Sequence, residues 1–315
     1  MPSRKLRRQL AFVTAVSNPA RYQTRYRLYR KFAEHIERGL GQRLVTVECQ
    51  LGDRPFEITD AGNPDHVQVR SNSELWHKEN MLNIAMSRLP TTIKYICWVD
   101  ADVEFLRADI VDETIHQLQH HSVVQMFQHC LDMGPAGEIL HTHSSFAYVD
   151  KTRQQFHPSY RPYAPGATFM HPGYAWAARR EFLDQTGGLF DVGVAGAGDH
   201  HMALALTGRV QESAPGGVHP KYHEALWMWQ EKALRACTGG LGYVNGSILH
   251  SWHGPKKARQ YESRWHILTE QQFDPTRDIE KNVQGVWELT GTKPVLRQLL
   301  GNYLKSRDED STSVD

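Results

Sequence analysis

The amino-acid sequence predicts an α/β fold with a mixed, mostly parallel central sheet flanked by helices. Short apolar runs rich in β-branched residues alternate with longer segments of helical periodicity, which is the order of βαβ units. One of these runs, Ile93–Val99, is followed directly by two carboxylates, Asp100 and Asp102. Such a run indicates a strand that is covered on both faces, as in a parallel sheet.

The composition is that of an ordinary globular protein. Of its 315 residues, 40% are hydrophobic and 23% are charged, and this length accommodates one large α/β domain or two small ones. No apolar run approaches the length of a membrane span, and no apolar core follows the basic start as in a secretory signal. The four cysteines form no CxxC pair. We therefore expect a cytoplasmic protein with reduced thiols and no membrane span.

Each element is predicted from its hydrophobic period and its end signals. Short apolar runs between turn residues predict strands, and apolar residues three or four positions apart predict helices. Ser71 and Glu74 have capping-box spacing, so a helix is expected to begin there. No glycine-rich fingerprint follows the first strand, which argues against a dinucleotide-binding Rossmann domain or a P-loop. In chain order the predictions are strand 10–16, helix 22–36, strands 44–48 and 67–69, helix 71–89, strand 93–99, helix 109–121, strand 123–127, helices 199–206 and 221–236, strand 242–249 and helical segments 259–270 and 293–305.

Residues 129–170 lack a clear period and are punctuated by histidine, proline and glycine. A loop-rich segment of this length inside a compact domain is usually functional, so we expect it to contribute to a site. Farther on, Asp199 opens a predicted helix and is interpreted as its N-cap.

Charge is distributed unevenly along the chain. Residues 1–43 hold eleven Lys and Arg against two Glu, whereas residues 44–150 hold six against sixteen Asp and Glu. A basic front and an acidic middle suggest that the front meets a polyanion while the middle holds cations. The alternative is that the basic residues form the solvated face of a helix and a tail.

The two acids at the end of the 93–99 strand point to a cation site. Asp100 and Asp102 are two residues apart, so on an extended backbone their side chains point to the same side. Two carboxylates held together repel each other unless a positive group compensates them. A divalent hard cation carrying a phosphorylated ligand would do so, and the alternative is a pair of solvated acids without a ligand.

Four motifs, taken in order, resemble those of nucleotide-sugar glycosyltransferases of the GT-A fold, of the galactosyltransferase-like or family 2-like kind. The resemblance covers roughly residues 10–265. The motifs are Lys78-Glu-Asn-Met-Leu-Asn83, the DxD-like Val99-Asp-Ala-Asp102, Tyr174-Ala-Trp-Ala-Ala-Arg179 with the following Gly187-Gly-Leu-Phe-Asp191 and Gly198-Asp199, and Leu249-His-Ser-Trp-His253. The resemblance implies displacement at a sugar anomeric carbon, with a nucleoside diphosphate as the leaving group and Mn²⁺ or Mg²⁺ as the cofactor.

The resemblance also implies a role for each motif residue. Asp102, His250 and, second, His253 would bind the metal, while Asp199 would be the general base of an inverting reaction. Gly198-Asp-His-His201 departs from the more acidic ending of relatives, which leaves Asp199 as the carboxylate there. The donor would be a UDP-sugar such as UDP-glucose. Its predicted contacts are Arg21, Arg25, Lys78, Asp100, Lys256 and Lys257, and the predicted acceptor contacts are Tyr174 and Trp176. Core packing of the two aromatic residues and a solvated helix face for the two arginines are the alternatives.

The acceptor is open at this stage. A hydroxymethylated base in DNA is one candidate, because the chain resembles soluble GT-A enzymes of the base J glucosyltransferase kind, and the basic front could neutralise phosphates. A saccharide, a lipid-linked or a protein acceptor are the others. Two further classes compete with a glycosyltransferase: a non-catalytic nucleic-acid-binding protein on this fold, and a metal-dependent nucleotidyltransferase or hydrolase.

The predicted organisation follows the resemblance. Residues 10–285 would form the GT-A domain, with a donor half (10–128) and an acceptor half (129–254). The remaining predicted segments are a basic N-terminal tail (1–9), a C-terminal helix (286–307) and a disordered acidic tail (308–315).

Overall fold

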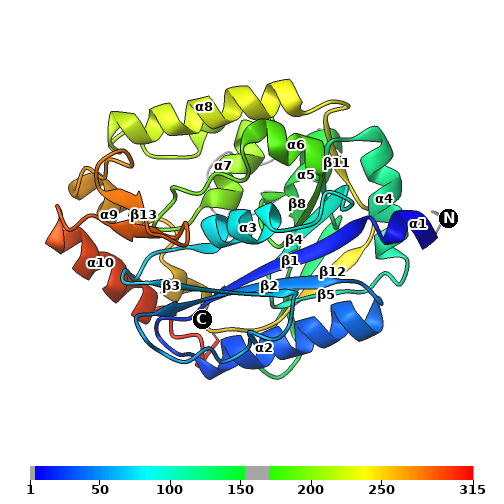
Figure 1. Ribbon diagram of the computed structural model, residues 1–315, viewed down its shortest axis with the longest axis horizontal. Coiled ribbons are helices and arrows are strands. Elements are labelled where there is room, and N and C mark those ends of the chain that lie inside the picture. Colours follow the sequence, from blue (N-terminus) through cyan, green and yellow to red (C-terminus); the bar gives the residue numbers. More distant parts are fainter. Residues whose placement is uncertain (1–3, 153–169, 315) are drawn as a thin grey trace.

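A computed structural model describes residues 4–152 and 170–314 and confirms the predicted α/β class. Its main sheet has seven strands in the order β11-β6-β10-β4-β1-β2-β3 (Figure 1). Only β10 runs antiparallel to its neighbours β4 and β6, and all the other pairs in this sheet are parallel. The predicted mixed, mostly parallel sheet is therefore correct.

The strands and helices alternate along the chain as the sequence predicts. Strands are β1 (Leu10–Ser17), β2 (Leu44–Leu51), β3 (His66–Ser71), β4 (Tyr95–Val99), β5 (Val103–Phe105), β6 (Val123–Gln125), β7 (His129–Met133), β8 (Ile139–Ser145), β9 (Met170–His171), β10 (Ala175–Arg179), β11 (Leu241–Tyr243), β12 (Ser247–His250), β13 (Ile279–Lys281) and β14 (Trp287–Leu289). Helices are α1 (Arg4–Arg7), α2 (Gln23–Glu34), α3 (Lys78–Ser87), α4 (Ile110–His120), α5 (Phe146–Thr152), α6 (Arg180–Thr186), α7 (Gly198–Ala205), α8 (Pro220–Ala236), α9 (Trp265–Glu270) and α10 (Pro294–Lys305), with shorter turns η1 (His35–Gly39), η2 (Val210–Glu212) and η3 (Lys256–Arg259).

The main sheet separates two hydrophobic cores. Along β1, Leu10 and Phe12 point into the core that α2 and α4 share, whereas Ala11 and Val13 point into the core beneath α3 and α8. Alternation of this kind follows from the two-residue period of a strand. Because both faces are covered, β1 and β4 read as continuous apolar runs in the sequence. Figure 1 shows α2 on one side of the sheet and α3 and α8 on the other.

A second sheet, in the order β5-β12-β7-β8-β9, brings distant segments to the end of β4. Strand β5 follows the Asp100-Ala-Asp102 turn directly and pairs with β12, so that Val103 lies opposite His250. On its other side β12 runs parallel to β7 and places His250 opposite Asp132. This pairing carries a histidine from late in the sequence to the carboxylates after β4.

Two sequence predictions about elements need correction. Helix α3 begins at Lys78 and not at Ser71, because Ser71 still belongs to β3 and its hydroxyl accepts the N–H of Ser73. Residues 129–152, expected to be loop-rich, form β7, β8 and α5. The remainder of that predicted segment, residues 153–169, lies outside the described residues.

The C-terminal residues also differ from the disordered tail that was predicted. Glu309 is 1% exposed and accepts hydrogen bonds from Arg25 and Arg307. The Asp310 carboxylate accepts the backbone N–H groups of Gln23 and Thr24 at the start of α2. A buried ion pair and a helix cap hold these acidic residues in place, and charge composition alone did not indicate either. In the 4–152 and 170–314 ranges, no helix has both the length and the apolar character that a bilayer crossing requires.

Candidate active site

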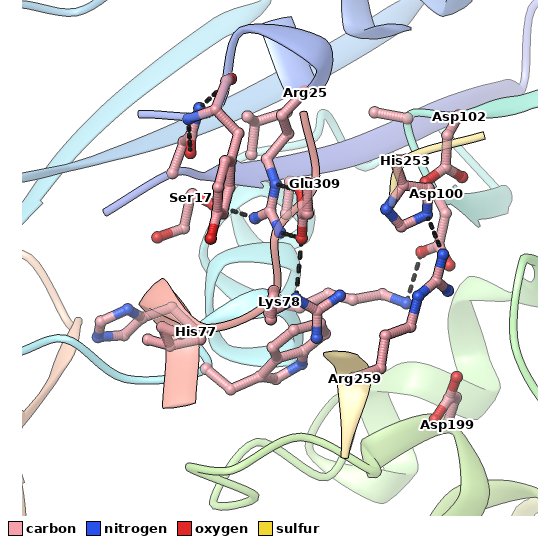
Figure 2. A pocket seen from close by; sticks show the side chains of 18 of the residues that line it. Ser17, Arg25, His77, Lys78, Asp100, Asp102, Asp199, His253, Arg259 and Glu309 are labelled. Carbon is pink, nitrogen blue, oxygen red and sulfur yellow. Dashed lines mark hydrogen bonds and ion pairs between the residues drawn. The ribbon is translucent and has the colours of Figure 1, made fainter. Parts of the chain in front are cut away.

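A cavity of about 220 Å³ opens where β1 and β4 end and where α2, α3 and α7 begin (Figure 2). In mostly parallel sheets, ligands bind at the carboxyl ends of the strands because helix N-termini and connecting loops converge there. The cavity brings together seven of the sequence-predicted donor, metal and base residues: Arg25, Lys78, Asp100, Asp102, Asp199, His250 and His253.

One end of the cavity contains the only group of acidic, histidine or cysteine side chains, among the described residues, that is arranged to hold a metal ion. It consists of Asp102, His250 and His253, whose ligand atoms all lie within 4.8 Å of one another. His253 Nε2 lies 3.1 Å from Asp102 Oδ2 and 3.2 Å from His250 Nε2, and His250 Nε2 lies 3.7 Å from Asp102 Oδ1. The structure thus brings both predicted histidines to the predicted aspartate.

The hydrogen-bond partners of the two imidazoles bear on which ring nitrogens are unprotonated. Arg259 Nη2 lies 3.0 Å from His253 Nε2, and a guanidinium can only donate, so in this contact the nitrogen is an acceptor, although Asp102 Oδ2 lies 3.1 Å from the same atom. His250 donates from Nδ1 to Asp132, 2.8 Å away, which leaves its Nε2 unprotonated in the neutral ring. Asp102 Oδ1 is buried and has no hydrogen-bond partner in residues 4–152 and 170–314. Two acceptor nitrogens and an unsatisfied carboxylate oxygen fit a divalent cation.

Protonation states agree with this arrangement. Burial raises the pKa of the Asp102 carboxyl, but the adjacent His250 and His253 lower it by more, so its pKa lies below the usual range. Burial, followed by the charge of Arg259, lowers the pKa of His253 to about 4. At neutral pH the aspartate is therefore charged while the His253 imidazole is neutral, which is the form that binds metals.

The other acid of the pair has a different partner. Lys78, the first residue of α3, places Nζ 2.5 Å from Asp100 Oδ1 (Figure 2). Burial raises the pKa of Asp100, although the neighbouring ammonium opposes the shift. The two carboxylates of the DxD-like turn are thus compensated separately, Asp100 by a lysine and Asp102 by imidazoles.

Asp199 lies in the first turn of α7 and lines the same cavity (Figure 2). It is not the N-cap, which is Ala197; instead its Oδ1 accepts the N–H of His200 at 2.8 Å. A Cβ atom on Gly173 would lie 2.6 Å from Asp199 Oδ2, so the carboxylate fits there only because residue 173 is a glycine. The position suits a base that faces the cavity.

Of the two predicted arginines, the structure brings one to the cavity. Arg25 lines it and pairs with Glu309, whereas Arg21 is 60% exposed and lies 3.7 Å from Glu57. Arg21 adopts a left-handed backbone conformation, with φ of 62°, at the turn before α2. Arg21 does not line this cavity, because the turn directs its side chain toward Glu57 in the loop after β2.

Lys256 and Lys257 do not form the predicted diphosphate cluster in the main cavity. Lys256 Nζ forms an ion pair with Asp132, and Lys257 is exposed. The cation that lines the cavity is Arg259, which is 9% exposed and whose Nε has no hydrogen-bond partner among the described residues. The sequence indicated the basic turn η3, but the residue of this turn that lines the cavity is Arg259 and not Lys256 or Lys257.

Of the two aromatic residues predicted to contact the acceptor, one lines the cavity and the other does not. Tyr174 lines the cavity with φ of 76°, and its hydroxyl donates to Asp132 at 3.0 Å. Trp176 is 4% exposed, stacks at 6.4 Å between ring centroids on Trp98 and donates its indole N–H to a backbone carbonyl. Core packing, the alternative that the sequence also allowed, therefore describes Trp176, which does not line this cavity.

Two acidic residues of the site were missed. Glu79 follows Lys78, lines the cavity and is buried against Gly198; burial raises its pKa to about 7. Its place in the Lys78 motif was the available signal. Asp132 lies on β7 beneath His250, in the segment interpreted as loop, so no pattern in the sequence indicated it.

Comparisons with known proteins give similarity at the level of structure alone. No family model and no curated protein sequence matches the chain. Solved structures similar to it include Drosophila β1,4-galactosyltransferase 7 in complex with manganese, UDP-Gal and xylobiose, at 13% identity and a TM-score of 0.33, over 65% of this chain and 61% of that one. The chain thus matches less than two thirds of that protein's length. Another is S. aureus TarS, at 9% identity and a TM-score of 0.37, over 77% of this chain and 60% of that one. Similarity at this level says nothing about activity or substrate.

Proposed function

We propose that the protein is a metal-dependent glycosyltransferase that moves a sugar from a nucleotide-sugar donor, a UDP-sugar, to an acceptor hydroxyl with inversion. The observation that carries the proposal is the pairing of two groups in one cavity. Asp102, His250 and His253 converge at one place, and Asp199 presents a carboxylate to the same space. A metal ligand set alone would fit many reactions, but a separate carboxylate beside it fits proton removal from an attacking hydroxyl.

Asp102, His250 and His253 would hold the cation. Two imidazoles beside one carboxylate favour Mn²⁺ over Mg²⁺, which prefers oxygen ligands and keeps several waters. When bound, the cation supplies Lewis-acid stabilisation of the negative charge on a leaving diphosphate.

The chain's own cations complete the donor site. Arg259 lines the cavity and donates to His253, and its Nε has no hydrogen-bond partner among the described residues, which would suit a phosphate oxygen. Lys78 is held by Asp100 at 2.5 Å, which fixes the ammonium at the cavity wall. Arg25 and Glu309 close the far end, near the turn after β1, and we assign this end to the nucleoside.

Asp199 would accept the proton of the acceptor hydroxyl as its oxygen attacks the anomeric carbon. A base that deprotonates the nucleophile directly, on the face opposite the leaving group, gives inversion. The Asp199 side chain is oriented by the N–H of His200 through Oδ1, and its Oδ2 packs on Gly173. These contacts hold the carboxylate in place.

For the acceptor, the described residues favour a saccharide over DNA. Six of the eleven basic residues of the front, namely Arg7, Arg21, Arg25, Lys31, Arg38 and Arg43, are paired with carboxylates. These pairs reduce the positive charge that the front can offer to a polyanion. Aromatic rings of Trp76, Tyr261 and Trp265 line the cavity and offer apolar faces for a sugar ring.

The test is to supply a panel of nucleotide sugars with Mn²⁺ and to measure thermal stabilisation and then turnover. A matching donor is expected to raise the melting temperature, because a ligand at a hundred times its Kd adds about 2.7 kcal/mol of stability. Manganese-dependent release of the nucleoside diphosphate that disappears in Asp102→Ala supports the proposal. Hydroxymethylated DNA and oligosaccharides then serve as the two acceptor arms.

A metal-dependent nucleotidyltransferase is the second candidate, because the same acids could serve it. The products separate the two. Transfer of a sugar with release of nucleoside diphosphate supports the glycosyltransferase, whereas a nucleotide retained on the acceptor supports the alternative. Absence of any nucleotide-sugar binding would leave the non-catalytic nucleic-acid-binding hypothesis.

A further inference from the structure

We infer that Asp132 is the positioning residue of the metal site: it orients His250 so that Nε2 faces Asp102 and His253. This inference rests on the proposed function, since it concerns the same cation. Asp132 does not line the main cavity and would not touch the cation or the substrates. It acts through His250, its direct neighbour across the β7–β12 pairing.

The Asp132 carboxylate is fully used by buried donors. Its Oδ1 accepts from His250 Nδ1 at 2.8 Å and from the Tyr174 hydroxyl at 3.0 Å. Its Oδ2 lies 2.6 Å from His143 Nε2 and forms an ion pair with Lys256. Asp132 is 2% exposed, so the charge of Lys256 compensates a carboxylate that is otherwise costly to bury.

The hydrogen bond to His250 decides which ring nitrogen faces the site. A carboxylate only accepts, so His250 Nδ1 must carry its hydrogen. In the neutral ring Nε2 then has the free electron pair, and this atom lies 3.2 Å from His253 Nε2 and 3.7 Å from Asp102 Oδ1. A carboxylate behind a ligating histidine also raises the basicity of the ring, and loss of such a partner typically costs about 10–100-fold in metal affinity.

Tyr174 holds the same histidine from a second direction. Its ring lies 4.5 Å from the His250 ring, centroid to centroid, and stacks at 3.8 Å on His171. Its left-handed backbone, with φ of 76°, is unusual for a bulky residue and is retained where the hydroxyl reaches Asp132. Asp132 and Tyr174 thus contact the His250 ring from two sides.

The experiment measures Mn²⁺ binding directly, by electron paramagnetic resonance titration of the whole protein. Asp132→Asn keeps the shape of the side chain and removes its charge, and we expect its Kd for Mn²⁺ to rise about 10–100-fold. Asp278→Asn is the matched control, because Asp278 is also buried and paired with a lysine, Lys293, at 2.7 Å but does not line the cavity. Its Kd should stay within about twofold of wild type. In turnover, Asp132→Asn should need more Mn²⁺ for half-maximal rate and approach the wild-type kcat at saturation.

The outcomes distinguish a failure of the proposed function from a failure of the inference about Asp132. A wild-type protein that binds no Mn²⁺ overturns the proposed function and the inference together. A wild-type protein that binds Mn²⁺, with Asp132→Asn binding equally well, overturns the inference alone. If Asp132→Asn fails to fold by circular dichroism, Tyr174→Phe takes its place, since it removes one hydrogen bond to Asp132 and keeps the ring. A severalfold weaker Kd for Tyr174→Phe supports the inference, and an unchanged Kd contradicts it.

Discussion

The two carboxylates of the DxD-like turn are compensated in opposite ways. Asp102 faces the imidazoles of His250 and His253, and its Oδ1 has no hydrogen-bond partner among the described residues. Asp100 instead pairs with Lys78, whose Nζ lies 2.5 Å from Asp100 Oδ1. An unsatisfied carboxylate beside two imidazoles can accept a cation, whereas a closed ion pair already contains one. We therefore expect separate tasks for these two acids, although only Ala101 lies between them in the sequence.

The largest effect is expected from removing the charge of the Asp102 carboxylate. Asp102→Asn would remove a proposed direct ligand, and Mn²⁺ affinity should then fall by more than the roughly 100-fold that an outer partner can contribute. Mn²⁺-dependent turnover should disappear with it. Asp100→Asn is the control, because Asp100 is paired with Lys78, and this variant should still bind Mn²⁺ in an electron paramagnetic resonance titration. Equal loss of Mn²⁺ binding in both variants would show that the two acids act as one site.

The next effect separates the base from the metal ligands. Asp199→Asn should lower kcat by about 10²–10⁴-fold, the usual contribution of a positioned general base, because the amide cannot take a proton. Its Mn²⁺ and donor affinities should stay unchanged, since Asp199 does not belong to the ligand set. Steady-state kinetics at saturating Mn²⁺ would check this. A variant that retains its kcat would remove Asp199 from the mechanism.

The buried carboxyl of Glu79, on the Asp199 side of the cavity, is expected to make the free energy of unfolding depend on pH. Burial raises its pKa to about 7 from 4.5, so between these values the folded state binds more protons than the unfolded state. The free energy of unfolding should therefore decrease as pH rises from 4.5 to 7, by about 3 kcal/mol at most from this group. Urea unfolding of the wild type and Glu79→Gln at pH 5 and pH 8 measures it. The variant should lose less stability than the wild type, and parallel losses would contradict the assigned pKa.

The smallest effect is expected at the exposed lysine of η3. Lys257→Ala should change KM for the donor by less than about twofold, because the side chain is exposed and does not line the cavity. Arg259→Met is the comparison and should raise KM by roughly 10-fold or more, as the loss of a charge-assisted hydrogen bond would. A larger rise in KM for Lys257→Ala than for Arg259→Met would contradict this and would support the basic cluster predicted from the sequence.

The sequence predicted the parts of the site that depend on local pattern. The apolar run before Asp100, the DxD-like spacing and the histidines at the end of β12 and just after it are all readable from neighbouring residues, and the structure brings Asp102, His250 and His253 together. Ion pairs between residues far apart in the sequence could not be predicted from local patterns. Lys256 was placed on a phosphate because its partner Asp132 lies on β7, in a stretch whose strand was not predicted.

The C-terminal segment shows the same limit. Its acidic composition indicated a disordered tail, yet Glu309 is buried between Arg25 and Arg307. Arg307 is only two residues from Glu309, but Arg25 is 284 residues away, and no local period connects it to them. Charge composition describes a segment in isolation, whereas burial of an ion pair depends on which surfaces the fold brings to it.

Anomalous diffraction from crystals soaked in Mn²⁺, recorded at the manganese absorption edge, tests most directly whether the carboxylate and the two imidazoles form a metal centre. The account predicts a single strong peak within bonding distance of an Asp102 oxygen and of Nε2 of both His250 and His253. A peak at Asp100 and Lys78, or none in the cavity of a crystal that binds Mn²⁺ elsewhere, would contradict it.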